Sequence, residues 1–471
     1  MRHGRADGPA CLWWVRRDLR LHDNPALAAA QKLGTVIPVF VLDPALQGRA
    51  PRRTAFLFAS LRALDGELRA RGSSLVVRRG PPPEVLARLL AETGARCVFA
   101  HADVSPFARR RESEVAQRVP LQLVGWPTAY SPLEARTSEG RPFTVFGAFR
   151  RWARSQPCPH PTLPPPERLR PHEVPSEPLP DAGGLPAGEQ AALERARQFA
   201  QGPIYDYHTL RDRLDRVGTS RLSADLRFGV LSPRAAMELG CRALEAAPTA
   251  QYREGPSRWL DELLWREFFA HILFHHPHSR REPLRPQLRE PVWEEDDRLY
   301  RAWCEGLTGY PVVDAAMREL VATGWICNRA RMVAASFLVK NLLLDWRLGE
   351  RFFMDHLVDG DPASNGGNWQ WVAGVGTDAA PYFRVFNPVL QGRRFDPDGT
   401  YVRRWLPELA WVPAPYVHAP WTLPRDDQIA HRCRVGRDYP APVVDLAESR
   451  RRALERYRAA ARPKRGGKLE L

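Results

Sequence analysis

Over the first 130 residues, short apolar runs alternate with amphipathic segments, and this alternation restricts the fold more than any other feature of the sequence. Four runs are expected to be buried strands, at residues 11–15, 35–42, 74–77 and 97–100. The segments between them are expected to be helices, at residues 24–33, 54–71 and 83–92. Strands that alternate with helices indicate a parallel sheet covered on both faces. The sequence therefore predicts a Rossmann-like α/β domain at residues 1–130. No GxGxxG motif follows the first strand, so a standard dinucleotide site is not expected there.

A proline-rich segment follows this domain. Residues 157–186 contain eleven prolines, a density that is typical of an extended connector. Because both flanking segments are rich in aromatic residues, an ordered segment that wraps the protein is favoured over a disordered hinge. The connector is assigned to residues 131–200.

From residue 201 onward the pattern is helical almost throughout. Ser232 and Pro233 begin one helix as its cap and its first residue. Further helical segments are apolar nearly all round or close to it, at residues 256–276, 326–344 and 350–358. Helices of that kind are buried in a large bundle. The prediction is an all-helical domain at residues 201–471.

The charge of the chain favours a polyanionic partner. Its formal net charge is +15 and its pI is about 10.0, although an arginine-rich proteome would give the same balance. No apolar run approaches the ~18 residues of a membrane span, and the N-terminal residues do not resemble a secretory signal. The seven cysteines are scattered with no CxxC pair, which indicates reduced thiols, a cytoplasmic location and no zinc site.

The first candidate site lies on the helix around residue 260. At ~100° per residue, Trp259, Glu262 and Arg266 share one side of this helix, and Trp265 adds a second aromatic ring beside the two charges. Charges on an apolar helix are costly unless each has a partner. The pattern therefore fits an aromatic-walled ligand pocket, and the alternative is a plain ion pair between Glu262 and Arg266.

Two further segments repeat this combination of polar groups and tryptophan. Asn328 and Arg331 share a helix face, and residues 359–371, DGDPASNGGNWQW, hold two aspartates of opposite charge to Arg331 and Arg266. The glycine pair in that stretch would let its backbone approach a flat ligand. The alternative is a polar network that only joins helices. A weaker signal is the loop GTSRLS at residues 218–223, which suits a phosphate or diphosphate but is also a common turn.

Several long motifs resemble the photolyase/cryptochrome family, and within it the class I cyclobutane pyrimidine dimer (CPD) DNA photolyases. They are RRDLRLHDNPAL (16–27), GTSRLS (218–223), WLDELLWREF (259–268), TGYPVVDAAMRELVATGWICNRARM (308–332), DGDPASNGGNWQW (359–371) and GTDAAPYFRVFNP (376–388). The similarity runs from about residue 11 to about residue 450. It therefore covers nearly the whole chain.

The resemblance implies that the helical domain binds FAD in a folded form. The positions that match the family's FAD contacts are Tyr207, Thr219, Ser220, Arg221, Leu222, Ser223, Trp259, Arg266, Asp359, Gly360, Asp361 and Asn365. It also implies that Asp359 pairs with Arg331 against the flavin and that Asn365 faces flavin N5. A neutral amide suits a fully reduced, anionic flavin, which a carboxylate would repel. Plant cryptochromes carry Asp and animal ones Cys at this position, so Asn365 favours repair over signalling.

The same resemblance implies a CPD as the substrate. Enzymes that act on (6-4) photoproducts carry histidines where this chain has Asn328 and Met332, and neither of these residues can act as an acid or base near neutral pH. Glu262 and Asn328 would hydrogen-bond a dimer that is flipped out of the DNA. Trp265 and Trp371 would form the apolar walls of its pocket.

DNA contacts are implied at Arg211, Arg329 and Gln391. Basic residues around them are expected either to contact phosphates, so that affinity falls with salt, or to form a solvated surface. These residues are Arg384, Arg393, Arg394, Arg403 and Arg404. The expected partner is double- or single-stranded DNA that carries pyrimidine dimers, bound by a monomeric protein.

The resemblance also offers a reason for the 15 tryptophans of the chain. Trp369, Trp346 and Trp293 match the family's electron-transfer chain, which runs from the flavin to the surface. Ordinary core packing is the alternative for any tryptophan. The resulting hypothesis is light-driven CPD repair by a photo-lyase, and a cryptochrome-type blue-light photoreceptor that binds FAD is the alternative.

Two segments concern metals and a second pigment. The four histidines in residues 271–278 are assigned to a helix end and not to a metal site, because no carboxylate triad accompanies them. Residues 102–112 depart from folate-binding relatives and are closer to deazaflavin-type ones. This leaves the identity of a second, antenna chromophore open between folate, deazaflavin and flavin.

Overall fold

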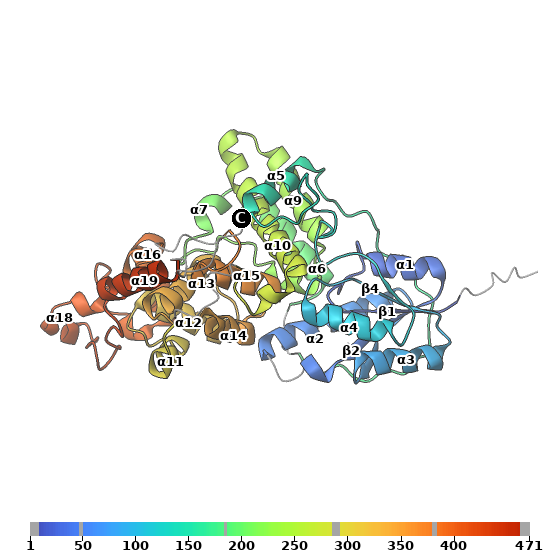
Figure 1. Ribbon diagram of the computed structural model, residues 1–471, viewed down its shortest axis with the longest axis horizontal. Helices are drawn as coiled ribbons and strands as arrows, with labels where there is room; N and C mark the ends of the chain where they lie inside the picture. Colours follow the sequence, from blue (N-terminus) through green and yellow to red (C-terminus); the bar gives the residue numbers. More distant parts are fainter. Residues whose placement is uncertain (1–8, 47–49, 183–185, 285–292, 379–383, 462–471) are drawn as a thin grey trace, which may run out of the picture. The chain divides into compact units, whose positions relative to one another are not determined.

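The computed structural model describes residues 9–46, 50–182, 186–284, 293–378 and 384–461 (Figure 1). The chain forms two compact units, and neither is continuous in sequence. The first contains Met1–Tyr205, Ser220–Pro277 and Val358–Ala363, and the second contains Asp206–Thr219, His278–Leu357 and Ser364–Leu471. These two units do not test the predicted domain boundaries near residues 130 and 200, which stay a prediction.

The first unit contains a five-stranded parallel sheet, which confirms the predicted α/β fold. Its strands are β1 (Cys11–Trp14), β2 (Val36–Leu42), β3 (Val76–Arg79), β4 (Val98–Ala100) and β5 (Leu121–Leu123), in the order β3-β2-β1-β4-β5. The register places Trp13 opposite Pro38 on one side and Phe99 on the other. Four of the strands lie in the predicted apolar runs. The fifth, LQL, is partly exposed and has no apolar run that could reveal it.

Helices follow the first four strands in the sequence and lie beside the sheet (Figure 1). They are α1 (Pro25–Leu33), α2 (Pro51–Ala70), α3 (Pro82–Thr93) and α4 (Pro106–Ala116). Each begins with proline, which tolerates the first helical position because its missing N–H would have no partner there. Asn24 caps α1 as predicted, since its Oδ1 accepts a hydrogen bond from Leu27 N at 3.0 Å. Ser105 caps α4 in the same way, and its Oγ accepts a bond from Ala108 N.

The proline-rich part of the connector, residues 157–186, lies along β3. Its described residues 157–182 contain no helix or strand, yet they hydrogen-bond to the sheet. Glu177 N donates to Val77 O at 3.0 Å, Val77 N donates to Ser176 Oγ at 2.9 Å, and Arg79 N donates to Glu177 Oε1 at 2.9 Å. The segment is extended because proline disfavours a helix, and it is ordered because a strand takes up its polar groups.

A disulfide joins Cys158, at the start of this connector, to Cys241 in α9 (Pro233–Ala246). The expectation that all cysteines are reduced thiols is therefore wrong for this pair. Sequence spacing could not reveal the bond, because its cysteines are 83 residues apart. The other five cysteines are free, and Cys11, Cys97 and Cys433 are buried.

Thiol counting is expected to detect this bond. Denatured protein alkylated without a reductant should carry five labels, and seven after reduction. Because a cross-link restricts the unfolded chain, Cys158→Ser or Cys241→Ser should lower the free energy of unfolding by about 2–4 kcal/mol. A Cys304→Ser variant, which removes a free thiol, serves as the control. Seven labels before reduction would contradict the assignment.

Helices dominate the rest of both units, as predicted for the C-terminal part of the chain. They are α5 (Phe146–Ser155), α6 (Glu189–Gln201), α7 (Tyr207–Leu210), α8 (Ser223–Phe228), α9, α10 (Ala250–His275), α11 (Asp297–Glu305), α12 (Pro311–Thr323), α13 (Asn328–Ser336), α14 (Trp346–His356), α15 (Pro362–Ala373), α16 (Pro388–Phe395), α17 (Thr400–Trp405), α18 (Arg425–Ala430) and α19 (Leu446–Ala461). No described helix has the length and apolar character needed to cross a membrane.

Two predicted helices differ from those observed. The helix expected to begin at Pro256 begins at Ala250, after Thr249 accepts a capping bond from Tyr252 N, so the proline lies inside it. The helix expected at residues 326–344 is interrupted: α13 ends at Ser336 and the next residues, Phe337–Asn341, form a π-helical turn. The periodicity of apolar residues cannot reveal one π-helical turn within a longer helical segment.

Candidate functional site

The predicted site residues are divided between the two units. The first unit carries Ser220, Arg221, Leu222, Ser223, Trp259, Glu262, Trp265, Arg266, Asp359, Gly360 and Asp361. The second carries Tyr207, Arg211, Thr219, Trp293, Asn328, Arg329, Arg331, Met332, Trp346, Asn365, Trp369, Trp371 and Gln391. Pairings predicted across the two units, such as Asp359 with Arg331, stay predictions. Within each unit, the geometry can be followed residue by residue.

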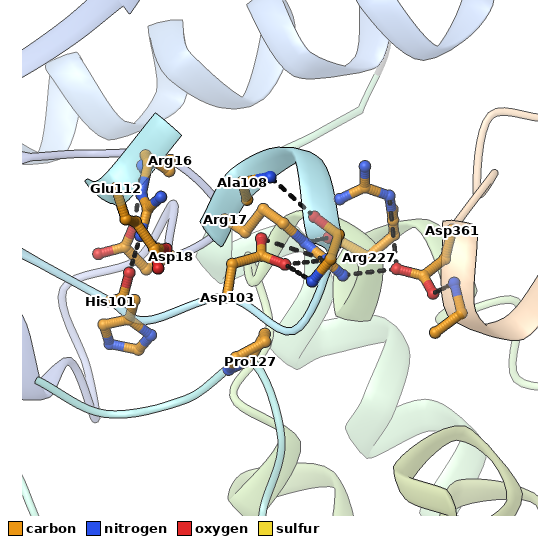
Figure 2. A network of polar contacts seen from close by, with 12 residues as sticks. Arg16, Arg17, Asp18, His101, Asp103, Ala108, Glu112, Pro127, Arg227 and Asp361 are labelled. Atoms are coloured by element: carbon orange, nitrogen blue, oxygen red, sulfur yellow. Dashed lines mark hydrogen bonds and ion pairs between the residues drawn. The ribbon is translucent and has the colours of Figure 1, made fainter. Parts of the chain in front are cut away.

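In the first unit, the start of the DGDPASNGGNWQW stretch is held by two arginines (Figure 2). Asp361 Oδ2 accepts a hydrogen bond from Arg17 Nη2 at 2.6 Å and lies 3.8 Å from Arg227 Nε. Arg227 Nε also donates to Gly360 O at 2.8 Å. The other carboxylate oxygen, Asp361 Oδ1, accepts from Ala363 N at 3.0 Å in the first turn of α15. Both oxygens of Asp361 thus have protein partners.

Arg17 joins this stretch to the sheet. It follows β1, and its guanidinium also lies 3.5 Å from the carboxylate of Asp103, which follows β4. Burial alone would lower the pKa of Arg17, but Asp103 and Asp361 outweigh it and raise the pKa. Burial lowers the pKa of Arg227 to about 9, with Arg17 adding to the effect and Asp361 opposing it. Of the two guanidinium groups that face Asp361, Arg17 therefore has the higher pKa and holds its proton more tightly.

Arg266 binds one acidic side chain and two carbonyls of the first unit. Its Nη1 donates to Glu267 Oε1 at 2.9 Å, and its Nη2 donates to Pro127 O and Leu226 O. Glu262, the acid of the alternative ion pair, lies 3.8 Å from Arg258 on the same helix. The adjacent Glu267 and two carbonyls thus serve this guanidinium, and a partnership of Arg266 with the aspartates of residues 359–371 stays a prediction.

The two tryptophans of α10 have different surroundings. Trp259 is buried and its Nε1 donates to Ser220 Oγ at 3.4 Å, which ties the GTSRLS loop to α10. Trp265 is partly exposed and stacks on Phe146, with ring centroids 3.6 Å apart and an angle of 11° between the planes. Phe269 also stacks on Trp265, with ring centroids 5.4 Å apart, so its role as a pocket wall stays a prediction. Arg221 in the loop is exposed and adopts a left-handed backbone with φ 53°.

In the second unit, Asn365 is buried and held by an acid that the sequence did not reveal. Its Nδ2 donates to both Glu350 O and Glu350 Oε1, each at 2.9 Å. Glu350 Oε2 lies 3.1 Å from Arg280 Nη1. One residue along, Gly366 is buried, and a Cβ built on it would meet no atom within 4 Å. A buried amide beside open space is the surrounding that a flat flavin ring requires, so these residues fit FAD.

Two of the predicted DNA contacts of the second unit, Arg211 and Arg329, lie beside one carboxylate, and Gln391 is joined to them through Arg329. Asp212 lies 2.7 Å from Arg329 Nη2 and 3.7 Å from Arg211 Nε. Arg329 Nη1 also donates to Gln391 Oε1 at 3.3 Å, and its guanidinium lies over Phe395. Sequence reasoning missed Asp212, for which the only signal was its position next to Arg211. An acid between two arginines fixes both, and it also offsets part of their charge.

Neighbouring residues extend this surface. Asn328 Nδ2 lies 3.6 Å from Met332 Sδ, so the two predicted lesion contacts meet on α13. Arg384 is exposed and lies over the rings of Trp371 and Phe386. Arg393, Arg394 and Arg404 are also exposed, whereas Arg403 is partly buried and donates to Val412 O. The structure therefore allows either reading of the exposed arginines.

The three predicted electron-transfer tryptophans all lie in the second unit. Trp369 and Trp346 are buried, and Trp293 is partly exposed beside Tyr457, with ring centroids 6.2 Å apart. Trp369 packs so closely on α14 that a Cβ at Gly349 would come within 2.1 Å of its ring. Trp303 was not predicted, yet it is fully buried and contacts Trp369 at 6.1 Å. Two of the three predicted tryptophans are thus buried and the third is partly exposed, and their role in electron transfer stays a prediction.

The remaining sequence features lie in the first unit, except that the last of the four histidines, His278, belongs to the second. Burial lowers the pKa of His271 to about 3, with His275 next in effect, and its Nε2 accepts a bond from Phe143 N. Among the described residues, no group of three or more His, Cys, Asp or Glu side chains is placed to hold a metal.

Segment 102–112 contains the start of α4, where Glu112 lies 2.7 Å from Arg16 and Arg111 lies 2.8 Å from Asp43.

Comparison with known proteins gives a consistent assignment. Residues 11–167 match the family model described as DNA photolyase, and residues 259–459 match the FAD binding domain of DNA photolyase. A deoxyribodipyrimidine photo-lyase from Thermus thermophilus is 43% identical over 461 residues, which cover 96% of this chain and 99% of that protein.

Two solved structures are also similar to this chain over nearly its whole length. A bacterial class III photolyase from Agrobacterium tumefaciens has a TM-score of 0.90 at 36% identity and covers 97% of this chain and 99% of its own. A cryptochrome from Synechocystis sp. has a TM-score of 0.86 at 30% identity and covers 97% of this chain and 100% of its own. The chain therefore belongs to the DNA photolyase family and contains its FAD-binding domain.

Proposed function

We propose that this protein is a deoxyribodipyrimidine photo-lyase that repairs cyclobutane pyrimidine dimers in DNA under light. The near full-length similarity to an enzyme of that name carries the proposal. FAD, when bound, supplies the electron that splits the dimer. The chain's own task is then to hold the cofactor, to bind the flipped dimer beside it, and to keep water out.

The proposed roles follow from the residue types and their surroundings. Glu262 and Asn328 hydrogen-bond the dimer, while Trp265 and Trp371 line its pocket. Met332 offers a soft apolar contact next to Asn328. None of these side chains need transfer a proton, because ring splitting of a dimer requires only that an electron arrives and returns. This is the reason that Asn328 and Met332 favour the dimer over the (6-4) photoproduct.

The alternative is a photoreceptor of the cryptochrome type. The similarity to the Synechocystis cryptochrome is the reason to consider it. Asn365 argues against it, since an amide suits the reduced flavin that repair requires. The sequence identity to the photo-lyase is also higher than that to the cryptochrome.

The decisive experiment is repair by the purified protein. Its flavin spectrum is recorded, and it is then illuminated with blue light on single- and double-stranded DNA that carries dimers, with a dark sample as control. Loss of dimers only under light supports the proposal. A flavin-bearing protein that leaves the dimers intact favours the photoreceptor. Activity on (6-4) photoproducts alone would refute the role given to Asn328 and Met332.

Arg329 is expected to contribute to DNA binding through phosphate. Arg329→Ala should weaken binding to DNA of any sequence and reduce the slope of log affinity against log salt by about one. Arg69→Ala on α2, which removes an exposed arginine that pairs with Asp65, is the control and should leave the slope unchanged. Affinity measured by fluorescence anisotropy at several salt concentrations tests this. An unchanged slope for Arg329→Ala would mean that this guanidinium serves its protein partners, Asp212 and Gln391, and does not bind phosphate.

A further inference from the structure

The disulfide between Cys158 and Cys241 links two helices that both pack on α10. Cys158 lies three residues beyond the end of α5, and Cys241 lies within α9. Helix α9 lies so close to α10 that a Cβ built on Gly240 would be 2.6 Å from Leu260 Cδ2 and 3.1 Å from the ring of Trp259. The disulfide therefore ties the end of α5 to a helix that is itself packed tightly on α10.

Helix α5 is held on α10 by ion pairs and by ring stacking. Asp261 of α10 is buried and accepts hydrogen bonds from Arg150 Nη1 at 3.1 Å and Arg154 Nη2 at 2.8 Å. Phe146, the first residue of α5, stacks on Trp265 of α10 with ring centroids 3.6 Å apart. How firmly α5 lies on α10 therefore determines how firmly this stack is held.

The segment that follows α5, residues 156–161, has few other attachments. Apart from the sulfur of Cys158, the hydrogen bonds of this segment within the described chain join residues between 152 and 160. Bonds to a distant part of the chain begin at Thr162, whose N donates to Asp23 Oδ1 at 3.3 Å. Opening the disulfide would therefore release the end of α5 from α9.

Both cysteines of the disulfide are open to a thiol in solution. Each is half-buried, whereas three of the five free cysteines are buried. Residues 154–157, directly before Cys158, are exposed, and the side chain of Arg242, directly after Cys241, is 72% exposed. Disulfides open to solvent are the exchangeable ones, because an attacking thiolate must reach a sulfur atom.

We propose that the Cys158–Cys241 disulfide is a site of thiol–disulfide exchange that controls how tightly α5 is held on α10. A thiolate of a dithiol reductant attacks one sulfur, and the S–S bond breaks as a mixed disulfide forms. The second thiol of the reductant then displaces the protein's sulfur. The protein pair gains two electrons and two protons and becomes two thiols, while the reductant becomes a disulfide.

The exchange reaches the candidate site through α5. In the oxidised protein, the end of α5 is fixed and Phe146 stays on Trp265. In the reduced protein this stack loosens, and the affinity for a dimer falls because the wall of its pocket is no longer ordered in advance. This rests on the proposed function, which places Trp265 in the dimer pocket.

Labelling of the folded protein tests the exchange. The FAD-loaded protein is treated with dithiothreitol in the dark, alkylated without denaturant, and digested for mass spectrometry. Labels are expected on Cys158 and Cys241, whereas the buried thiols of Cys11, Cys97 and Cys433 should stay unlabelled. If the pair takes up label only after denaturation, the bond is a purely structural cross-link and the proposal is wrong.

Hydrogen exchange tests the hold on α5. Reduction should speed amide exchange in α5 about tenfold and leave α2 unchanged. A double variant, Cys158→Ser with Cys241→Ser, should exchange fast with or without dithiothreitol, and Cys304→Ser should respond as the unaltered protein does. Exchange in α5 that ignores reduction of the unaltered protein would overturn the proposal, and this result does not depend on how well the double variant folds.

Binding of damaged DNA tests the link to the site. Anisotropy is measured in the dark on an oligonucleotide with one dimer, and reduction should weaken this binding about fivefold while binding of undamaged DNA stays the same. Faster exchange in α5 with unchanged dimer affinity would overturn the link to the pocket. A protein that never prefers dimers would refute the proposed function instead, because labelling and hydrogen exchange require no DNA.

Discussion

Arg17→Met is expected to lower the free energy of unfolding by about 3–5 kcal/mol, because it removes one partner of a buried charge network and leaves the others behind. The guanidinium lies 2.6 Å from Asp361 and 3.5 Å from Asp103, and all three side chains are largely buried. Arg227 still faces Asp361 in the variant, so Asp103 bears most of the loss. Methionine fills a similar volume, which keeps cavity formation a minor contribution.

The pH dependence of this loss identifies its origin. Burial works to raise the pKa of Asp103, but Arg17 and then Arg16 overcome it and hold the pKa below its usual value. Such a carboxylate contributes stability above its unfolded pKa and loses it as the pH falls through the folded pKa. Without Arg17, burial should prevail and raise that pKa, so protonation would relieve the buried charge. The deficit of the variant should therefore shrink between about pH 7 and about pH 4.

Urea unfolding of both proteins across this range measures the effect. Arg62→Met is the control, because Arg62 pairs with Asp181, whose side chain is 94% exposed. A surface pair of this kind contributes about 0–1 kcal/mol. If Arg17→Met costs no more than Arg62→Met, the network does not stabilise the protein in the way its geometry indicates.

Lys340→Met is expected to stabilise the protein. Lys340 lies in the π-helical turn, is fully buried, and its Nζ has no hydrogen-bond partner among the described residues. Burial lowers its pKa from 10.5 to about 7. This difference corresponds to a penalty on the order of 4 kcal/mol at neutral pH. The ring of Tyr457, 3.7 Å from Nζ, returns about 0.5–2 kcal/mol as a cation–π contact. The penalty for burying the charge of Lys340 exceeds the gain from the cation–π contact, so the methionine variant should have the higher free energy of unfolding.

The sign of the pH dependence follows from the lowered pKa. Between about 7 and about 10.5, the unfolded chain binds this proton and the folded chain does not, so stability contributed by this group rises with pH. The advantage of Lys340→Met should therefore be largest at or below about pH 7 and fade toward pH 10. Lys32→Met, at an exposed position in the last turn of α1, should change stability by less than about 0.5 kcal/mol. A destabilised Lys340→Met would mean that the ammonium has a stabilising partner.

The fold could be predicted where local chemistry decides it. The first four strands each contain an uninterrupted apolar run, and Asn24 followed by Pro25 marks the start of α1. Strand β5 could not be predicted, because Gln122 separates its two leucines and leaves no apolar run. This strand forms through its pairing with β4, which the local sequence does not show. The π-helical turn at Phe337–Asn341 also escaped, since its residues are as apolar and as buried as those of a regular helix.

For the candidate site, the sequence suggests residues but does not reveal the contacts that hold them. Motif resemblance names Asp361 and Asn365 without saying what holds them. Arg17 lies 344 residues from Asp361 along the chain, and nothing in the pattern around either residue points to the other. Glu350 is hidden for a different reason: an acid near the middle of a helix usually faces solvent, and only tertiary packing turns this one inward.

The connector beside β3 has a consequence for how the protein behaves at high concentration. A terminal strand of a sheet offers unpaired N–H and C=O groups that other chains can use for intermolecular pairing. Here Ser176 and Glu177 occupy the amides of Val77 and Arg79, and the prolines on either side have no N–H to recruit a further strand. A protease cut in this segment would leave the protein folded but would expose the edge of β3 to other chains. The intact connector therefore also protects the protein against self-association.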